Sequence, residues 1–146
     1  MNLTAILFEQ LKRHEGFRSK PYRDSIGKLT IGFGRNLDDV GIDGSEAEIL
    51  LEADIDRALD AASRFIWFRL LETARQSVVV NMIFNLGLQK FSGFKNMIRF
   101  IELKNYALAA KEMLNSKWAS QVGDRAKELA QIMETGEIPK SPQQGG

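Results

Sequence analysis

The chain has 146 residues, with 20 Lys and Arg against 19 Asp and Glu and a net charge of +1 at pH 7. This length suits one domain, and the balanced charge gives no indication of a nucleic-acid or anionic-membrane partner. There is no cysteine and only one histidine, His14, which excludes disulfides, thiolate metal sites and multi-histidine metal sites.

The N-terminal segment predicts an amphipathic helix. Leu3, Leu7 and Leu11 recur at four-residue intervals, and Gly16 is placed to end the helix. The same interval places Glu15 beyond Leu11 on the buried face, where the pKa of a carboxyl rises unless a cation reaches it. The segment is too short and too polar for a signal peptide or a membrane span, so we expect synthesis in the cytoplasm.

A hairpin is predicted next, with strands over residues 20–24 and 29–33. Within the second strand, Thr30, Gly32 and Gly34 share one face. Because glycine has no side chain, we expect open space beside the Thr30 hydroxyl.

After a polar loop, Asp43 and Glu46 form a capping-box-like start. The apolar spacing that follows predicts one long helix to about residue 64, without an internal Gly or Pro. Such a helix could connect a small hairpin lobe to a second lobe.

The remainder is predicted to be a helical lobe. Its separators are Gly87, Gly93, Asn105 and Gly123, and its helices are expected over residues 73–86, 92–104, 106–116 and 124–135. The segment FIWFRLL is either a short helix or a packed connector, and periodicity does not decide between them. The tail GEIPKSPQQGG is expected to be disordered or a linker.

Three residues near the hairpin suggest chemistry. Taken singly, Glu15 reads as a solvated helix end, Asp24 as a turn starter and Thr30 as a strand residue. Together they place two carboxylates in different local settings with a hydroxyl nearby. This is what acid/base hydrolysis of a glycosidic bond requires.

The joint pattern resembles a known family. Glu, eight residues, Asp, five residues and Thr, followed by IGFG, closely resembles the phage-type lysozymes, the muramidases of tailed bacteriophages. Further segments also resemble this family: SEAEILLEADIDRAL, NMIFNLG with FSGFKN, and SKWASQVGDRAKEL. Together the similar segments cover most of residues 1–136.

The resemblance implies an α+β, mainly α, two-lobe lysozyme-like fold within a single catalytic domain, residues 1–136. A hairpin lobe over about 16–42 is joined by the long helix to a helical lobe over about 65–136, which includes the N-terminal helix. Residues 137–146 are then a flexible tail or linker. The implied enzyme is a glycoside hydrolase, an endolysin that cleaves the β-1,4 bond between N-acetylmuramic acid and N-acetylglucosamine of peptidoglycan for host cell lysis.

The resemblance also implies catalytic roles. Glu15 matches the general acid, Asp24 the second carboxylate and Thr30 the hydroxyl that helps to hold the attacking water. Carboxyl groups about 6.5 to 9.5 Å apart leave room for water and give inversion, whereas about 5 Å indicates retention. We predict inversion.

Substrate-binding positions carry over as well. Phe84 and Asn85 match the helix end that lines the cleft, where the family's usual second residue is Gln. Asn36, Met97 and Glu112 fall where the family contacts sugar, although the side chains differ.

Three supporting residues are predicted. Arg125 matches the cation near the catalytic acid. Arg35 stands where many relatives have His, and we predict that it pairs with Asp54 on the long helix. The loop over residues 37–42 is shorter than in larger relatives, which predicts a more open cleft edge.

The expected partner is the glycan strand of peptidoglycan. No metal, cofactor, nucleic acid or stable membrane insertion is expected, and the chain is predicted to be a monomer. A separate membrane-permeabilising protein is expected to release it from the host bacterial cytoplasm to the cell wall. Two alternatives stay open: a lytic transglycosylase, and a non-catalytic peptidoglycan-binding domain of a phage particle.

Overall fold

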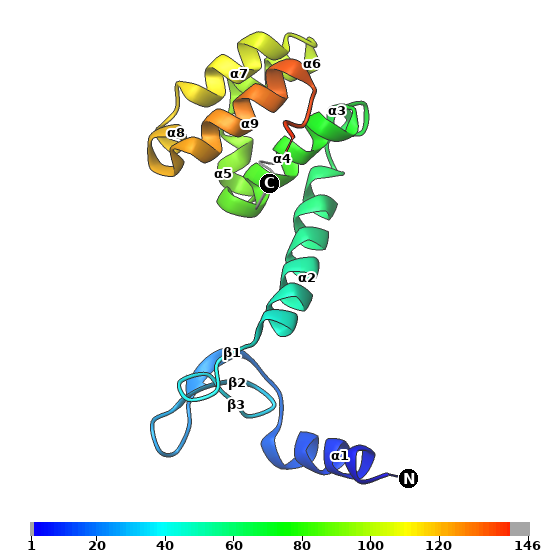
Figure 1. The fold of residues 1–146 in the computed structure, drawn as a ribbon, viewed down its shortest axis with the longest axis vertical. Helices are drawn as coiled ribbons and strands as arrows, with labels where there is room; N and C mark the ends of the chain where they lie inside the picture. Colours follow the sequence, from blue (N-terminus) through cyan, green and yellow to red (C-terminus); the bar gives the residue numbers. More distant parts are fainter. Residues whose placement is uncertain (1, 141–146) are drawn as a thin grey trace. The chain divides into compact units, whose positions relative to one another are not determined.

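The computed structural model describes residues 2–140 and divides into two compact units, Met1–Leu50 and Leu51–Gly146, each of which is described by itself (Figure 1). The elements of the N-terminal unit are α1 (Leu3–Glu15), β1 (Arg18–Arg23), β2 (Leu29–Gly32), β3 (Arg35–Asn36) and the start of α2 (Gly44–Ala62).

Helix α1 confirms the predicted N-terminal helix. The Asn2 side chain accepts a hydrogen bond from Ala5 N–H at 2.8 Å and caps its start. At its end, Gly16 has φ 68° and donates its N–H to Lys12 C=O at 3.0 Å. The expected burial of Glu15 is wrong for this unit: α1 contains no buried residue, because nothing in the unit covers its leucine stripe.

The three strands form one antiparallel sheet in the order β1-β2-β3. The predicted hairpin is confirmed, with a register shift between Arg18 and Tyr22. Pro21, which has no N–H to donate, lies in this irregular stretch. The third strand was not predicted because it contains only two residues. It makes β2 the central strand, in which Thr30 pairs with Tyr22 on one side and Asn36 on the other.

Helix α2 begins with the predicted capping box. Glu46 N–H donates to Asp43 Oδ1 at 2.8 Å, and Asp43 N–H donates to Glu46 Oε1 at 3.1 Å. Each carboxylate therefore satisfies one backbone donor at the helix start. The helix runs to Ala62, close to the predicted end.

The C-terminal unit contains the rest of α2 and further helices. These are α3 (Ile66–Arg69), α4 (Thr73–Leu86), α5 (Leu88–Ser92), α6 (Lys95–Glu102), α7 (Tyr106–Leu114), α8 (Lys117–Val122) and α9 (Asp124–Thr135). The predictions for α4 and α9 are confirmed residue for residue, and that for α7 nearly so. The predicted helix over 92–104 is wrong at its start, because Gly93 and Phe94 separate α5 from α6. Both α5 and α8 are too short for periodicity to reveal.

The core of the C-terminal unit is apolar and aromatic. Helix α4 contributes four buried residues, Val78, Val79, Met82 and Ile83. Aromatic rings continue from α3 to α8, each ring centroid within 6.5 Å of the next, through Phe65, Trp67, Phe91, Phe94 and Trp118. Helices α7 and α9 pack closely on each other.

The predicted fold class is confirmed: mainly α, with a small antiparallel sheet near the N-terminus. No helix within residues 2–140 has the length and apolar character needed to cross a membrane. Residues 137–140 form no helix or strand, and the remainder of the tail prediction lies outside the described residues. The expectation of a single domain stays a prediction.

Candidate active site

Glu15 lies at the end of α1 with its carboxylate against the backbone of Gly34. A β-carbon on Gly34 would lie 2.8 Å from Glu15 Oε2 and 2.9 Å from Cδ. Gly34 also has φ 80°, a conformation that favours glycine. The turn after β2 therefore needs glycine for two reasons, and one of them is the approach of Glu15.

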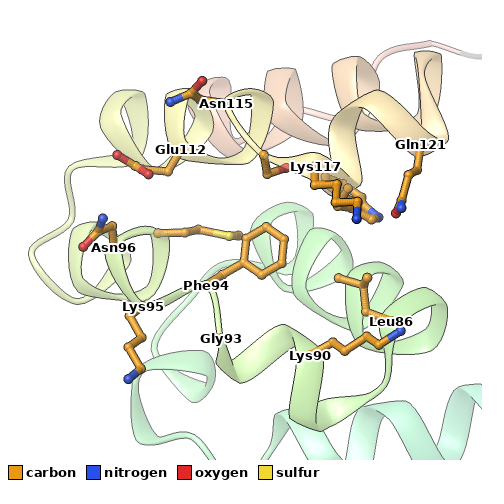
Figure 2. Close-up of a pocket in the computed structure, with 13 residues that line it drawn as sticks. Leu86, Lys90, Gly93, Phe94, Lys95, Asn96, Glu112, Asn115, Lys117 and Gln121 are labelled. Atoms are coloured by element: carbon orange, nitrogen blue, oxygen red, sulfur yellow. The ribbon is translucent and has the colours of Figure 1, made fainter.

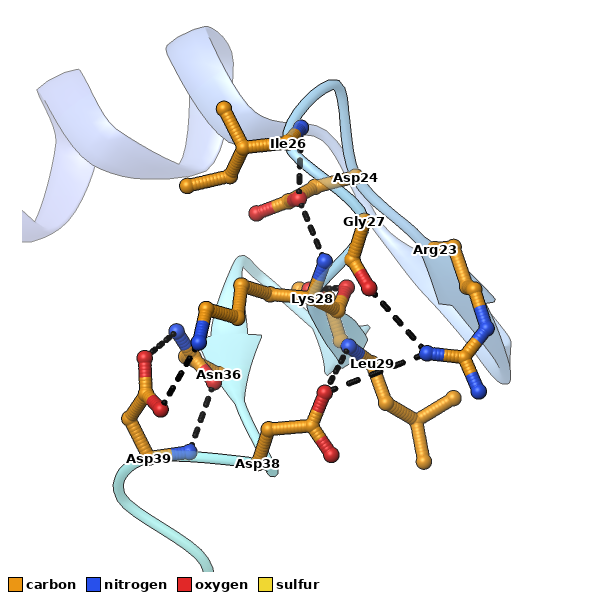
Figure 3. A network of polar contacts seen from close by, with 10 residues as sticks. Arg23, Asp24, Ile26, Gly27, Lys28, Leu29, Asn36, Asp38 and Asp39 are labelled. Atoms are coloured by element: carbon orange, nitrogen blue, oxygen red, sulfur yellow. Dashed lines mark hydrogen bonds and ion pairs between the residues drawn. The ribbon is translucent and has the colours of Figure 1, made fainter.

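Asp24 lies at the start of the turn that joins β1 to β2 (Figure 3). Its Oδ1 accepts hydrogen bonds from Ile26 N–H at 3.0 Å and Lys28 N–H at 2.8 Å. Its own N–H donates to Lys28 C=O at 2.9 Å. Such an Asx turn fixes one carboxylate oxygen, while Oδ2 accepts no hydrogen bond within residues 2–140.

Thr30 is only 3% exposed, so the expected open space beside its hydroxyl is wrong. The physical reason is its place on the central strand, where the hydroxyl donates to Lys28 C=O at 2.8 Å. Space beside a Cβ exists at Gly32, whereas Glu15 occupies the space at Gly34. Because its one proton is used, the Thr30 hydroxyl can only accept further hydrogen bonds.

The backbone of Lys28 links Asp24 to Thr30. Its N–H donates to the Asp24 carboxylate, and its C=O accepts the Thr30 hydroxyl proton. The structure therefore holds these two predicted catalytic residues through a single peptide segment. Sequence reasoning missed this role, because a backbone contact leaves no signal in the residue type at position 28.

The loop after β3 is fixed to the same turn by acids (Figure 3). Asp38 accepts from Leu29 N–H at 2.8 Å, and Asp39 accepts from Lys28 Nζ at 3.1 Å. The hydrogen bond from Lys28, followed by one from Asn36 at 3.0 Å, lowers the pKa of Asp39. Asn36, predicted to contact sugar, thus has its amide engaged by Asp39, whose N–H also donates to Asn36 Oδ1 at 2.9 Å.

Arg35 pairs with Glu46, not with the predicted Asp54. Both terminal guanidinium nitrogens contact the Glu46 carboxylate, and NH1 also donates to Gly41 C=O at 2.9 Å. Asp54 instead pairs with Arg57 at 2.8 Å. The physical reason is local: Glu46 stands in the first turn of α2, where the capping contacts with Asp43 hold its carboxylate back toward the loop.

This ion pair affects two acids. The hydrogen bond from Arg35 is the largest cause that lowers the pKa of Glu46, while the same contact raises the pKa of Arg35. At Asp43, the backbone N–H of Glu46 is the largest cause of a lowered pKa. The shortened loop is therefore closed at its end by a charged hydrogen-bond network.

Residues predicted to line the cleft from the C-terminal unit form two groups. In the first, Phe84 is 44% exposed and lines a cavity of about 320 Å³ together with Arg125. Arg125 donates to Asn81 Oδ1 from Nε at 3.0 Å and from NH2 at 2.7 Å. The predicted approach of Arg125 to Glu15 stays a prediction.

Asn85, next to Phe84 at the end of α4, accepts a hydrogen bond from Trp118 Nε1–H at 2.7 Å.

Met97 and Glu112 belong to the second group and line a cavity of about 510 Å³ (Figure 2). Met97 is fully buried and so serves the core as well. Glu112 is half-buried on α7. Among the described residues, no group of three or more Asp, Glu, His or Cys is placed to hold a metal ion.

Comparison with known proteins identifies the family. The sequence model of the family described as "Phage lysozyme" matches residues 12–133. The chain is 31% identical to the endolysin of Salmonella phage P22 over 85% of this chain and 89% of that protein. It is 29% identical to probable T4-type lysozyme 1 of Dictyostelium discoideum, over 89% of this chain and 94% of that protein.

A third relative is named as a spike protein and not as a lysozyme or an endolysin. The chain is 26% identical to the pre-baseplate central spike protein Gp5 of Enterobacteria phage T4, over 89% of this chain and 28% of that protein. The family match, the endolysin similarity and the confirmed fold class agree with one another. The chain therefore belongs to the phage lysozyme family, and its enzyme class is that of a lysozyme, a glycoside hydrolase.

Proposed function

We propose that the protein is an endolysin muramidase that hydrolyses the β-1,4 bond between N-acetylmuramic acid and N-acetylglucosamine in peptidoglycan, with inversion. The observation that carries this proposal is the arrangement of Glu15, Asp24 and Thr30 in one unit. Glu15 lies against Gly34, and Asp24 and Thr30 share the Lys28 backbone. Membership of the phage lysozyme family supports it.

In this mechanism Glu15 donates its proton to the leaving glycosidic oxygen. Its carboxylate needs a fixed direction for that transfer, and contact with Gly34 restricts its position. Asp24 acts as the base for the attacking water. Two backbone N–H groups hold its Oδ1, so Oδ2 is the oxygen that can receive the proton from water.

Thr30 assists by accepting a hydrogen bond from the same water. Its proton is committed to Lys28 C=O, so its lone pairs point away from that bond and are free to accept. Since the residue is nearly buried, a water molecule fits this role better than a bulkier group. Inversion requires carboxyl groups about 6.5 to 9.5 Å apart.

The biological setting follows from this activity. The substrate is the glycan strand of the host cell wall, and the endolysin similarity supports a role in host lysis. Before lysis the protein resides in the host cytoplasm as a monomer, and a separate membrane-permeabilising protein gives it access to the wall. No cofactor takes part.

The test is digestion of purified peptidoglycan by wild type and by Glu15→Gln, Asp24→Asn and Thr30→Ala variants. We expect reducing ends from wild type, loss of activity of about 100-fold or more for Glu15→Gln and Asp24→Asn, and a smaller loss for Thr30→Ala. Glu9→Gln, which removes an exposed acid from the same helix as Glu15, is the matched control. Full activity of Glu15→Gln would contradict the mechanism.

Product analysis separates hydrolysis from transglycosylation. Anhydro-muramic ends would show a lytic transglycosylase. If reducing ends form instead, NMR of the first of them shows whether the anomeric centre inverts. A second candidate function is suggested by similarity to a protein named as a phage spike. Wild type that binds peptidoglycan without releasing reducing ends would favour such a non-catalytic role in a phage particle.

A further inference from the structure

The peptide group between Lys28 and Leu29 is bound on both of its sides. Its carbonyl, that of Lys28, accepts the Thr30 hydroxyl proton at 2.8 Å and the Asp24 N–H at 2.9 Å. Its N–H, that of Leu29, donates to Asp38 Oδ2 at 2.8 Å (Figure 3). A trans peptide group is planar, with its C=O and N–H directed to opposite sides. A bond that fixes one of them therefore also fixes the direction of the other.

A side chain makes this bond because the sheet ends here. Strand β3 ends at Asn36, which pairs with Thr30, so no residue of β3 lies opposite Leu29. Leu37 N–H still donates to Leu29 C=O at 2.7 Å, but Leu29 N–H is received by the Asp38 carboxylate in place of a strand carbonyl. Hydrogen bonds to a carboxylate are roughly twice as strong as those between neutral groups. The acid at position 38 thus completes the pairing of the central strand.

We propose that Asp38 is a positioning residue for hydrolysis. It holds the peptide group between Lys28 and Leu29 in the direction that fixes the Thr30 hydroxyl. The inference rests on the proposed function, in which Thr30 accepts a hydrogen bond from the attacking water. While the Lys28 carbonyl takes the hydroxyl proton, the hydroxyl can only accept. If that carbonyl turns away, the hydroxyl is free to rotate and to donate, and the water loses its fixed partner.

Asp39 provides a comparison within the same loop. Within residues 2–140 its carboxylate accepts hydrogen bonds only from side chains, Lys28 Nζ at 3.1 Å and Asn36 Nδ2 at 3.0 Å. Both acids therefore anchor the loop, whereas Asp38 contacts the peptide group that binds Thr30 and Asp39 does not. Variants of the two acids separate anchoring of the loop from the direction of the peptide group.

The test measures kcat and KM for release of reducing ends by wild type, Asp38→Ala, Asp38→Asn and Asp39→Ala, with urea unfolding to show that each variant is folded. For Asp38→Ala we expect kcat to fall about tenfold, less than when a catalytic group itself is misplaced, with KM little changed. Asp38→Asn keeps an oxygen that can accept Leu29 N–H and should recover most of kcat, although it loses the charge that lies 3.9 Å from Arg23.

Three outcomes of these measurements overturn the inference. One is a kcat of Asp38→Ala equal to that of wild type. The second is an equal loss in Asp38→Ala and Asp38→Asn, which would assign the effect to the charge. The third is an equal loss in Asp38→Ala and Asp39→Ala, which would assign it to anchoring of the loop.

A double mutant tests the path through Thr30. Thr30→Val removes the hydroxyl but keeps the branched shape, and the Asp24 carboxylate is held separately, by the N–H groups of Ile26 and Lys28. Addition of Asp38→Ala to Thr30→Val should therefore lower kcat by less than twofold, against about tenfold in wild type. A merely structural role of Asp38 would give the same factor in both backgrounds and would overturn the proposal.

Amide hydrogen exchange, followed by NMR, keeps the contact separate from catalysis. The Leu29 amide should exchange severalfold faster in Asp38→Ala than in wild type or Asp38→Asn, because its acceptor is gone. If wild type releases no reducing ends while this exchange still accelerates, the proposed function fails and the positioning of the peptide group by Asp38 stands. If wild type hydrolyses peptidoglycan and Asp38→Ala changes neither exchange nor kcat, the inference fails and the proposed function stands.

Discussion

The Glu15 carboxylate lies so close to the α-carbon of Gly34 that no side chain fits between them, since a β-carbon there would be 2.8 Å from Oε2. This contact joins the end of α1 to the turn between β2 and β3. The position of the proposed acid, Glu15, therefore depends on the absence of a side chain at residue 34. The consequence is testable because Gly32, two residues earlier, also has a positive φ but lacks the contact with Glu15.

Gly34→Ala is expected to reduce activity far more than it reduces stability. Its φ of 80° makes any β-carbon costly, by about 1–2 kcal/mol. In addition, the new methyl group must displace Glu15 Cδ and Oε2, which moves the proton donor. We expect a loss of activity of about 100-fold, as for the misplacement of a catalytic group, measured as release of reducing ends.

Gly32→Ala is the control for that prediction. Gly32 has φ 71°, so alanine is strained there too, yet its β-carbon would meet no atom within 4 Å. Both variants should lose similar free energy of unfolding, measured with urea, but Gly32→Ala should keep most of its activity. Equal activities in the two variants would show that the contact with Glu15 has no catalytic role.

Several features of the fold could be predicted because local rules determine them. Gly16 ends α1, and the Asp43 and Glu46 pair begins α2, as spacing alone predicts. The exposure of Glu15 within the N-terminal unit could not be predicted in this way. A leucine stripe shows which face is apolar, but it does not show what covers that face, and within the N-terminal unit nothing does.

The candidate site was predictable in residue type but not in contacts. The pattern of Glu15, Asp24 and Thr30 is visible in the sequence, whereas the Lys28 backbone that joins two of them is not. Arg35 was assigned to the wrong acid because helix α2 offers several carboxylates. Only the fold of the loop over residues 37–42 shows that Glu46 is the partner.

Removal of Arg35 should change how stability depends on pH. In the folded protein the pKa values of Glu46 and Asp43 are lowered. The two ionised carboxylates therefore add to the free energy of unfolding above the ordinary carboxyl pKa of about 4, and this stabilisation is lost as the pH falls through the lowered values. Arg35→Gln should therefore be less stable than wild type near neutral pH, and the difference should shrink on acidification.

The measurement for Arg35→Gln is urea unfolding at pH 7 and at about pH 3, below the ordinary carboxyl pKa. Arg13→Gln serves as the control, because Arg13 is exposed and makes no ion pair within residues 2–140. The Arg13→Gln substitution removes the same positive charge but breaks no ion pair. If the difference between Arg35→Gln and wild type were the same at both pH values, the pair with Glu46 would have no such effect.

Lys104 offers a site for stabilisation. It is the one non-glycine residue within residues 2–140 with positive φ, 59°, and it lies between α6 and α7. The Lys104→Gly substitution relieves this strain in the folded protein but makes the unfolded chain more flexible, which opposes folding. The net increase in the free energy of unfolding should therefore be about 1 kcal/mol or less. Lys111→Gly, at an exposed position inside α7, should lower stability by about 1 kcal/mol. Thermal unfolding measures both, and a destabilised Lys104→Gly would contradict the argument.

Asn85 should stabilise the protein through the Trp118 indole. Trp118 is 4% exposed, and its Nε1–H donates to Asn85 Oδ1 at 2.7 Å. Asn85→Ala leaves a buried donor without a partner, which costs about 1–3 kcal/mol, whereas Asn85→Asp keeps an acceptor and should lose less. Urea unfolding followed by tryptophan fluorescence gives both values. If alanine and aspartate cost the same, the hydrogen bond contributes nothing, and the loss must come from the amide's other surroundings on α4.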